Sequence, residues 1–188
     1  MKIGNYLMIL LSAQAMFLTG CAQLQAPKYS FSPEDVQSLK ETGGGKIRVG
    51  EFKAATAETE TQNLSLRAAH MQSPYGSYAN YLKEALQDEI REAGRLADDA
   101  SIELTGVLVK HVFDASGMST GVGELQAQIV VSRGGNKVYD KLQSAKISWE
   151  SSFVGAVAIP KAVTEYPRLM REFVHTLVLD PEFRSAIK

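Results

Sequence analysis

Two apolar runs joined by a glycine-rich turn constrain the fold of this chain more than any other feature. Residues 124–133 alternate between apolar and polar side chains, as expected for a strand with one buried face. Residues 137–149 return with apolar side chains on one face. Between them, Gly134-Gly135-Asn136 is typical of a hairpin turn, because glycine and asparagine tolerate positive φ angles. The sequence therefore predicts a long antiparallel hairpin.

Two more strands and two amphipathic helices are predicted around this hairpin. Residues 46–52 alternate, and residues 101–113 are rich in β-branched side chains, so both are expected to join the sheet. An apolar stripe at three-four spacing predicts a helix over 77–93, closed by Gly94 in a left-handed conformation. A second stripe predicts a C-terminal helix whose main segment begins near Pro167. Asp180-Pro181 predicts the start of a short terminal helix.

The predicted element order defines the fold class. A strand, a helix, three strands and a helix favour an α+β two-layer sandwich. We expect a mostly antiparallel four-stranded sheet with two amphipathic helices on one face. Residues 46–188 are long enough to form a single α+β domain. Within it, the polar, threonine-rich stretch 54–73 shows no clear period and predicts an irregular loop.

The segment 21–45 has a different composition. It contains few aliphatic residues, two prolines and the run Gly43-Gly44-Gly45, which together predict a flexible tether. A short helix from Pro33 to Lys40, capped by Ser32, is the one local element expected there. Such a tether would hold the folded domain tens of Å from its point of attachment.

The N-terminal residues are typical of an exported protein. An apolar segment follows Lys2 and ends in Leu18-Thr19-Gly20-Cys21, which contains the only cysteine of the chain. The segment is shorter than the roughly 20 apolar residues of a spanning helix. It matches a secretory signal peptide over 1–20, with small residues before the cleavage site. Two alternatives give Cys21 no special role. The segment is then an ordinary signal peptide or a buried helix, with the cysteine there by chance.

Leu18-Thr19-Gly20-Cys21 resembles the lipobox of bacterial lipoprotein precursors. The resemblance implies cleavage before Cys21 and acylation of that cysteine, for example with palmitate, so that lipid would anchor the protein to a membrane. Ala22 stands where an aspartate would favour the inner membrane of Gram-negative bacteria. This favours the periplasmic face of the outer membrane, with the inner membrane as the alternative.

Charge argues against one class of partner. Residues 1–20 contain one lysine, so their removal moves the formal net charge from −1 to −2. No basic patch stands out, and nucleic acid is therefore not an expected partner. No phosphate-binding glycine loop or other cofactor motif is present in the sequence.

One motif would indicate a catalytic serine if a helix followed it. Gly117–Gly121 matches the G-x-S-x-G pattern, and Asp140 and His175 could follow Ser119 as acid and base. The motif lies between two predicted strands and not before a helix, so we interpret it as a flexible hairpin loop. A serine hydrolase remains the least favoured hypothesis, and the chain is not expected to be an enzyme.

The remaining titratable residues show no catalytic or metal-binding pattern. The three histidines are too scattered for metal ligation and are interpreted as surface or boundary residues. Asp88-Glu89 and Asp98-Asp99 are interpreted as solvated charges. The histidines are His70, His111 and His175. No metal site is expected.

The apolar linker 149–160 and one tyrosine are the candidate contact residues. Trp149 and Phe153 are its large side chains. The linker either closes the core at the end of the sheet or presents a surface for a partner or lipid. The side chain of Tyr75 likewise either packs in the core or is exposed for such a contact.

The lipobox and the element order over 46–188 together are similar to auxiliary lipoproteins of ABC-type lipid transport systems. The resemblance implies a non-catalytic adaptor or auxiliary component of an envelope complex, with an envelope protein as partner. A carrier of lipids or amphiphiles is the alternative, and it would need an apolar cavity between sheet and helices.

Overall fold

The computed structural model describes residues 23–56, 59, 63–67 and 69–188. The predicted signal peptide and Cys21 lie outside these residues. In chain order the described elements are β1 (Gln23–Gln25), α2 (Pro33–Thr42), β2 (Ile47–Ala54), β3 (Asn63–Leu66), β4 (Ala69–Gln72), α3 (Tyr78–Glu92), β5 (Ile102–Asp114), β6 (Thr120–Arg133), β7 (Asn136–Glu150), α4 (Gly155–Leu179) and α5 (Pro181–Ala186).

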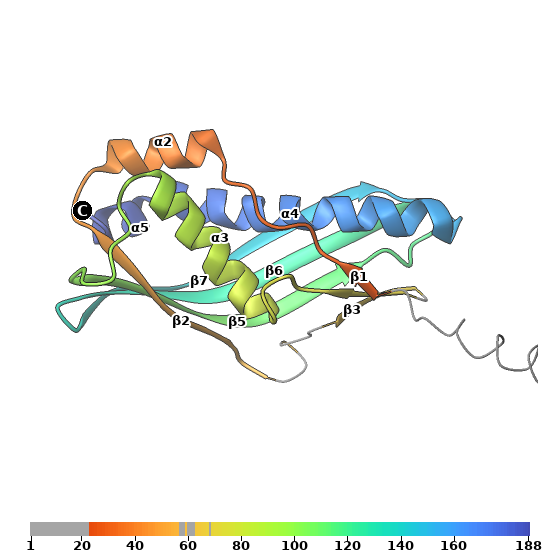
Figure 1. Ribbon diagram of the computed structural model, residues 1–188, viewed down its shortest axis with the longest axis horizontal. Helices are drawn as coiled ribbons and strands as arrows, with labels where there is room; N and C mark the ends of the chain where they lie inside the picture. The colour runs from red at the N-terminus through yellow and green to blue at the C-terminus, as the bar shows by residue number, and fades with distance from the viewer. Residues whose placement is uncertain (1–22, 57–58, 60–62, 68) are drawn as a thin grey trace, which may run out of the picture.

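A four-stranded sheet in the order β2-β5-β6-β7 forms one layer, and the helices form the other. β5, β6 and β7 pair antiparallel, whereas β2 runs parallel to β5. Figure 1 shows α3 and α4 lying across the same face of the sheet. At the β6–β7 turn, Gly134 and Gly135 have φ angles of 54° and 83°, as the hairpin prediction requires. The α+β prediction, with a mostly antiparallel sheet and helices on one face, is confirmed.

A second, three-stranded sheet corrects the prediction of an irregular loop over 54–73. Its order is β1-β4-β3. Leu64, Leu66 and Met71 are buried, so two short strands cover part of the core. β3 and β4 have only 4 residues each, which is too few for the alternation to stand out among threonines and glutamines.

The segment expected to be a flexible tether is folded from Gln23 onward. β1 pairs with β4, and the side chains of Ala26, Tyr29 and Leu39 are buried. α2 begins as predicted, with the Ser32 hydroxyl accepting a hydrogen bond from a backbone N–H of the first turn. The few apolar side chains of this stretch suffice because most of them pack into the core, although Phe31 is 42% exposed. The prediction of a tether over 21–45 is therefore wrong for its described part.

The two long helices follow their apolar stripes. α3 ends as predicted, with Gly94 at φ 71° and the Arg95 N–H donating to the Ile90 carbonyl at 2.9 Å. α4 begins at Gly155, well before Pro167. Small buried residues extend its stripe toward the N-terminus and let that part of the helix lie close to the rest of the core. These are Ala158 and Ala162.

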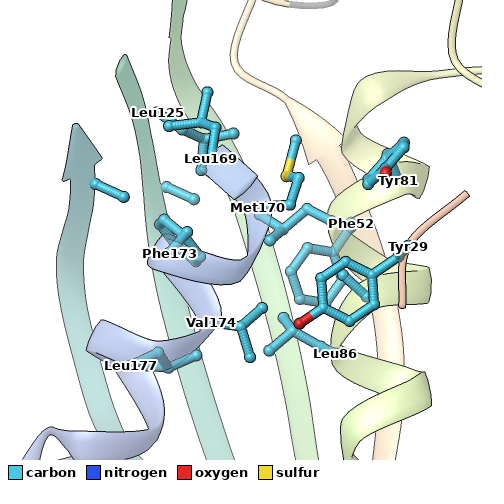
Figure 2. Close-up of a cluster of buried hydrophobic side chains, with 14 of the residues drawn as sticks. Tyr29, Phe52, Tyr81, Leu86, Leu125, Leu169, Met170, Phe173, Val174 and Leu177 are labelled. Atoms are coloured by element: carbon cyan, nitrogen blue, oxygen red, sulfur yellow. The ribbon is translucent and has the colours of Figure 1, made fainter. Parts of the chain in front are cut away.

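The core between sheet and helices is filled by side chains. Figure 2 shows the apolar side of α4 facing Leu125 of β6 on one side and Phe52 of β2 and Leu86 of α3 on the other. The labelled residues of α4 all have relative exposures of 0%. They are Leu169, Met170, Phe173, Val174 and Leu177. A core packed in this way holds the strands and helices as one rigid support for the surface described next.

Candidate interaction site

The structure separates the three predicted contact residues. Phe153 is 72% exposed, Trp149 only 6%, and Tyr75 is half-buried. Trp149 stacks on Phe113 at 4.8 Å between ring centroids, so it closes the core and supplies no contact surface. Tyr75 packs edge-on against Tyr81 of α3 at 5.3 Å. Phe153 is therefore the one of the three that offers a large apolar surface to solvent.

A glycine makes room for Trp149. Gly121 pairs with Trp149 across β6 and β7. A Cβ atom at Gly121 would lie 2.3 Å from the indole ring, so any other residue would displace the tryptophan. The last glycine of the G-x-S-x-G match thus has a packing role.

Phe153 belongs to a group of exposed apolar side chains at one end of the molecule. Met118 comes from the loop between β5 and β6, and Val154 and Val157 come from the start of α4. Met118 is 74% exposed and Val157 is 59% exposed. We call this group, together with Arg67, the Arg67 tip. Its apolar side chains have no packing role in the core, so their exposure needs another explanation.

Arg67 holds the loops of the tip together. It lies in the β3–β4 turn with a φ of 58°, a left-handed conformation that is uncommon outside glycine. Its guanidinium donates to the carbonyl oxygens of Ala115 and Gly117 at 2.9 Å each, and of Ser152 and Phe153 at 2.7 Å each. The planar, multiply donating guanidinium is suited to such a cluster of acceptors. One side chain thus fixes two loops that are far apart in the sequence.

The residues of the hydrolase hypothesis do not come together. Ser119 precedes β6, whereas Asp140 pairs with Val130 near the other end of that strand. Ten residues of strand separate these levels, which is about 33 Å. His175 bonds instead to Asp35 of α2, at 2.7 Å from Nδ1 to Oδ1. Ser119, Asp140 and His175 therefore cannot form a proton relay in this fold.

The histidines occupy three different environments. His70 is exposed on β4 and His175 is exposed on α4, as expected for surface residues. The hydrogen bond that His175 donates to the Asp35 carboxylate raises the pKa of His175. His111 is partly buried at the boundary of the core, as its prediction allows, and its ring lies among Tyr78 and Tyr166. In the part of the chain that the structure describes, no three His, Cys, Asp or Glu side chains are grouped to hold a metal ion.

Burial lowers the pKa of His111 to about 4, so stability should fall in mild acid. Below pH 6.5 the His111 imidazole is protonated in the unfolded chain. In the folded chain it stays neutral until about pH 4. The contribution of His111 to the free energy of unfolding should therefore decrease as the pH falls, by up to about 2 kcal/mol between pH 6.5 and 5. Denaturant titrations at both pH values measure this. In His111→Gln the loss should be smaller by that amount, and an unchanged loss would contradict the assignment.

Glu89 is a buried acid that the sequence interpretation missed. The sequence predicts a solvated charge at this position, yet the relative exposure of Glu89 is 0%. Its Oε1 accepts hydrogen bonds from the Tyr29 hydroxyl at 2.6 Å and from the Ser32 N–H at 2.8 Å. Burial raises the pKa of this carboxyl group. Its place three residues after Leu86 and four before Ala93, within the apolar stripe, was the signal for burial.

Comparisons with known proteins define the class of fold. No protein-family model and no curated protein sequence matches the chain. Among solved structures, a Xanthomonas campestris protein of the family DUF330 aligns with a TM-score of 0.61 and 12% identity, covering 87% of this chain and 96% of that one. A minor lipoprotein from Acinetobacter baumannii aligns with a TM-score of 0.44 and 9% identity, covering 74% and 92%. The first likeness shows that the two proteins share a fold.

None of the helices within the described ranges has the length and hydrophobicity to cross a bilayer.

Proposed function

We propose that this chain is a lipid-anchored envelope protein and acts without catalysis, as an adaptor or auxiliary component of an envelope complex. One observation carries the proposal: the lipobox cysteine, Cys21, stands two residues before the first strand of the folded domain. A lipid at that position would fix a rigid domain directly to a membrane. The outer membrane, at its periplasmic face, is the expected location.

The open face of the four-stranded sheet is a suitable contact surface for a protein partner. Odd-numbered residues of β6 from Leu125 to Val131 point to the helices and are buried, so even-numbered ones point outward. On this outer face, Val122 and Leu142 are 45% and 53% exposed. Lys110 and Lys146 flank Glu124 at 2.8 and 3.4 Å, adding charges that could select a partner.

The carrier alternative has less support. A carrier of this fold would hold its ligand between the sheet and the helices. That space is occupied by a continuous cluster of aromatic rings at centroid distances near 5 Å. The cluster joins Tyr78, Tyr81, Phe113 and Tyr166 from α3, β5 and α4. An acyl chain would have to displace these rings.

Replacing the lipobox cysteine tests the anchor. Cys21→Ala removes the sulfur that would carry the lipid, so the protein should leave the membrane fraction and lose incorporation of labelled palmitate. Fractionation after cell lysis and metabolic labelling measure both effects, with Ala22→Ser as the matched control. If Cys21→Ala stays fully membrane-bound, the lipid is not the anchor.

A photo-crosslinking residue at Leu142 tests the adaptor role. Leu142 lies on the outer face of β7, so we expect a discrete crosslinked adduct in native membranes. The same residue placed at Glu92, which is exposed at the end of α3, is the control and should give no adduct. Comparable labelling at both positions would argue that the outer face is not a specific surface.

A further inference from the structure

The chain enters its folded domain beside the Arg67 tip. β1 runs parallel to β4, with Gln23 opposite His70 and Gln25 opposite Gln72. Because the pairing is parallel, the first residue of β1 lies at the same end as the start of β4. The turn that carries Arg67 comes directly before that end of β4. The direction of β1 therefore brings the polypeptide into the domain from the side of the tip.

The distance from the tip to the lipobox cysteine is bounded by the chain itself. Cys21 is two residues before Gln23, and two residues span at most about 7 Å. Strand partners such as Gln23 and His70 lie about 5 Å apart. Three residues farther back, Arg67 contacts the Phe153 carbonyl. A lipid on Cys21 would thus enter the bilayer close to the exposed side chains of the tip.

We propose that the Arg67 tip inserts its apolar side chains into the interfacial region of the same bilayer that holds the lipid on Cys21. The inference rests on the proposed lipid anchoring. It explains why four apolar side chains are exposed together at this end, where a short connection leaves the domain little freedom to stand away from the membrane. They are Met118, Phe153, Val154 and Val157. Figure 1 shows β1 and the start of α4 at the same end of the molecule.

The arrangement of the tip suits a membrane surface. Interfacial segments bury their apolar groups by only about 5–10 Å, which side chains on loops and a first helical turn can reach. The backbone carbonyls of these loops would be costly to bury without partners. Four of them already accept hydrogen bonds from Arg67. The guanidinium thus satisfies backbone groups next to the inserted side chains.

A fluorescent probe at Met118 tests the insertion. Because Cys21 is the only cysteine and would be occupied by lipid, Met118→Cys introduces a single reactive thiol for an environment-sensitive dye. The full lipidated protein is reconstituted into vesicles of phosphatidylethanolamine and phosphatidylglycerol, with doxyl groups either in the acyl chain or at the headgroup. We expect a blue-shifted emission and quenching by the acyl-chain doxyl. Val138→Cys, about 40 Å away along β7, is the matched control and should not be quenched.

A second variant separates insertion by the protein from insertion by the dye. Phe153→Asp with Val157→Asp, labelled at position 118, should still sediment with vesicles but lose most of its acyl-chain quenching. Each buried side chain of this size favours the bilayer by about tenfold or more. Full quenching in this variant would overturn the proposal, because the dye alone would account for it.

The other outcomes distinguish the two proposals. Protein that sediments with vesicles but is quenched only by the headgroup doxyl, or not at all, overturns insertion and leaves the anchor intact. A blue shift without quenching by either lipid would mean that the tip contacts protein, and this result also overturns insertion. Protein that does not sediment with vesicles contradicts the lipid anchor itself.

Discussion

Arg95→Met is expected to lower the free energy of unfolding by about 3 kcal/mol, because it leaves several buried carbonyl groups without a donor. Arg95 is 6% exposed, and its guanidinium donates to the carbonyls of Leu39, Gly45 and Ile187. These carbonyls belong to the last turn of α2, the segment between α2 and β2, and the C-terminal segment. Burial lowers the pKa of Arg95, as expected for a cation withdrawn from water. The side chain of methionine keeps most of the packing volume.

Denaturant unfolding of the purified protein measures this effect. Arg91→Met is the matched control, since Arg91 is exposed on α3 and its ion pair with Asp88 lies at the surface. That variant should change the free energy of unfolding by no more than about 0.5 kcal/mol. If both substitutions changed the free energy of unfolding equally, the hydrogen bonds of the Arg95 guanidinium would contribute nothing beyond the packing of its aliphatic carbons.

Arg67→Ala is expected to cost about 2–3 kcal/mol and to loosen both loops of the tip. The substitution removes hydrogen bonds to four carbonyl groups, so the loops that carry Met118 and Phe153 lose the links that the guanidinium provides. The backbone hydrogen bond from the Ser151 N–H to the Ser119 carbonyl would still join them. Denaturant unfolding gives the energy, and amide hydrogen exchange over 115–118 and 151–154 gives the loosening. Faster exchange confined to these two segments is the expected pattern.

Arg67→Gly separates the side chain from the backbone. Glycine adopts the φ of 58° without the cost of about 1 kcal/mol that alanine carries there. It should therefore be less destabilised than Arg67→Ala by about that amount, with the same faster exchange. If Arg67→Gly were as stable as the unmodified protein, backbone strain and not the guanidinium would dominate at this position.

Elements with strong local patterns could be predicted from the sequence. The β6–β7 hairpin is indicated by alternation and a glycine turn, and α3 by a capped apolar stripe. Each of these patterns lies within a single stretch of chain. Such features need no knowledge of what the element packs against. For this reason the fold class and helix starts such as that at Pro33 were accessible.

Elements that depend on distant partners could not. β1 has 3 residues and exists through its pairing with β4, which lies more than 40 residues later in the chain. Tyr29 likewise is buried because Glu89 accepts its hydroxyl hydrogen bond. Prolines and few aliphatic residues made this stretch look like a tether. Tertiary contacts overrode that composition.

The candidate site was accessible only in part. The linker 149–160 was identified as apolar, yet the sequence does not distinguish Trp149, which faces the core, from Phe153, which faces solvent. The difference arises because β7 ends at Glu150 and the alternation stops there. Arg67 was missed altogether, since its acceptors are backbone carbonyls that no motif reveals.

Because residues 23–45 are folded onto the domain, they cannot act as a spacer between the domain and a membrane anchor at Cys21. If a lipid on Cys21 anchors the chain as proposed, only Ala22 separates the lipidated residue from β1, and the domain would be held at a nearly constant distance from the membrane. β7 has 15 residues and spans about 50 Å, which is the most by which the Gly134-Gly135 hairpin can rise above the tip. Under the proposed anchoring, a partner that binds the outer face of the sheet would have to lie within that layer next to the membrane. Inserting residues between Cys21 and Gln23 would then move the contact surface away from such a partner.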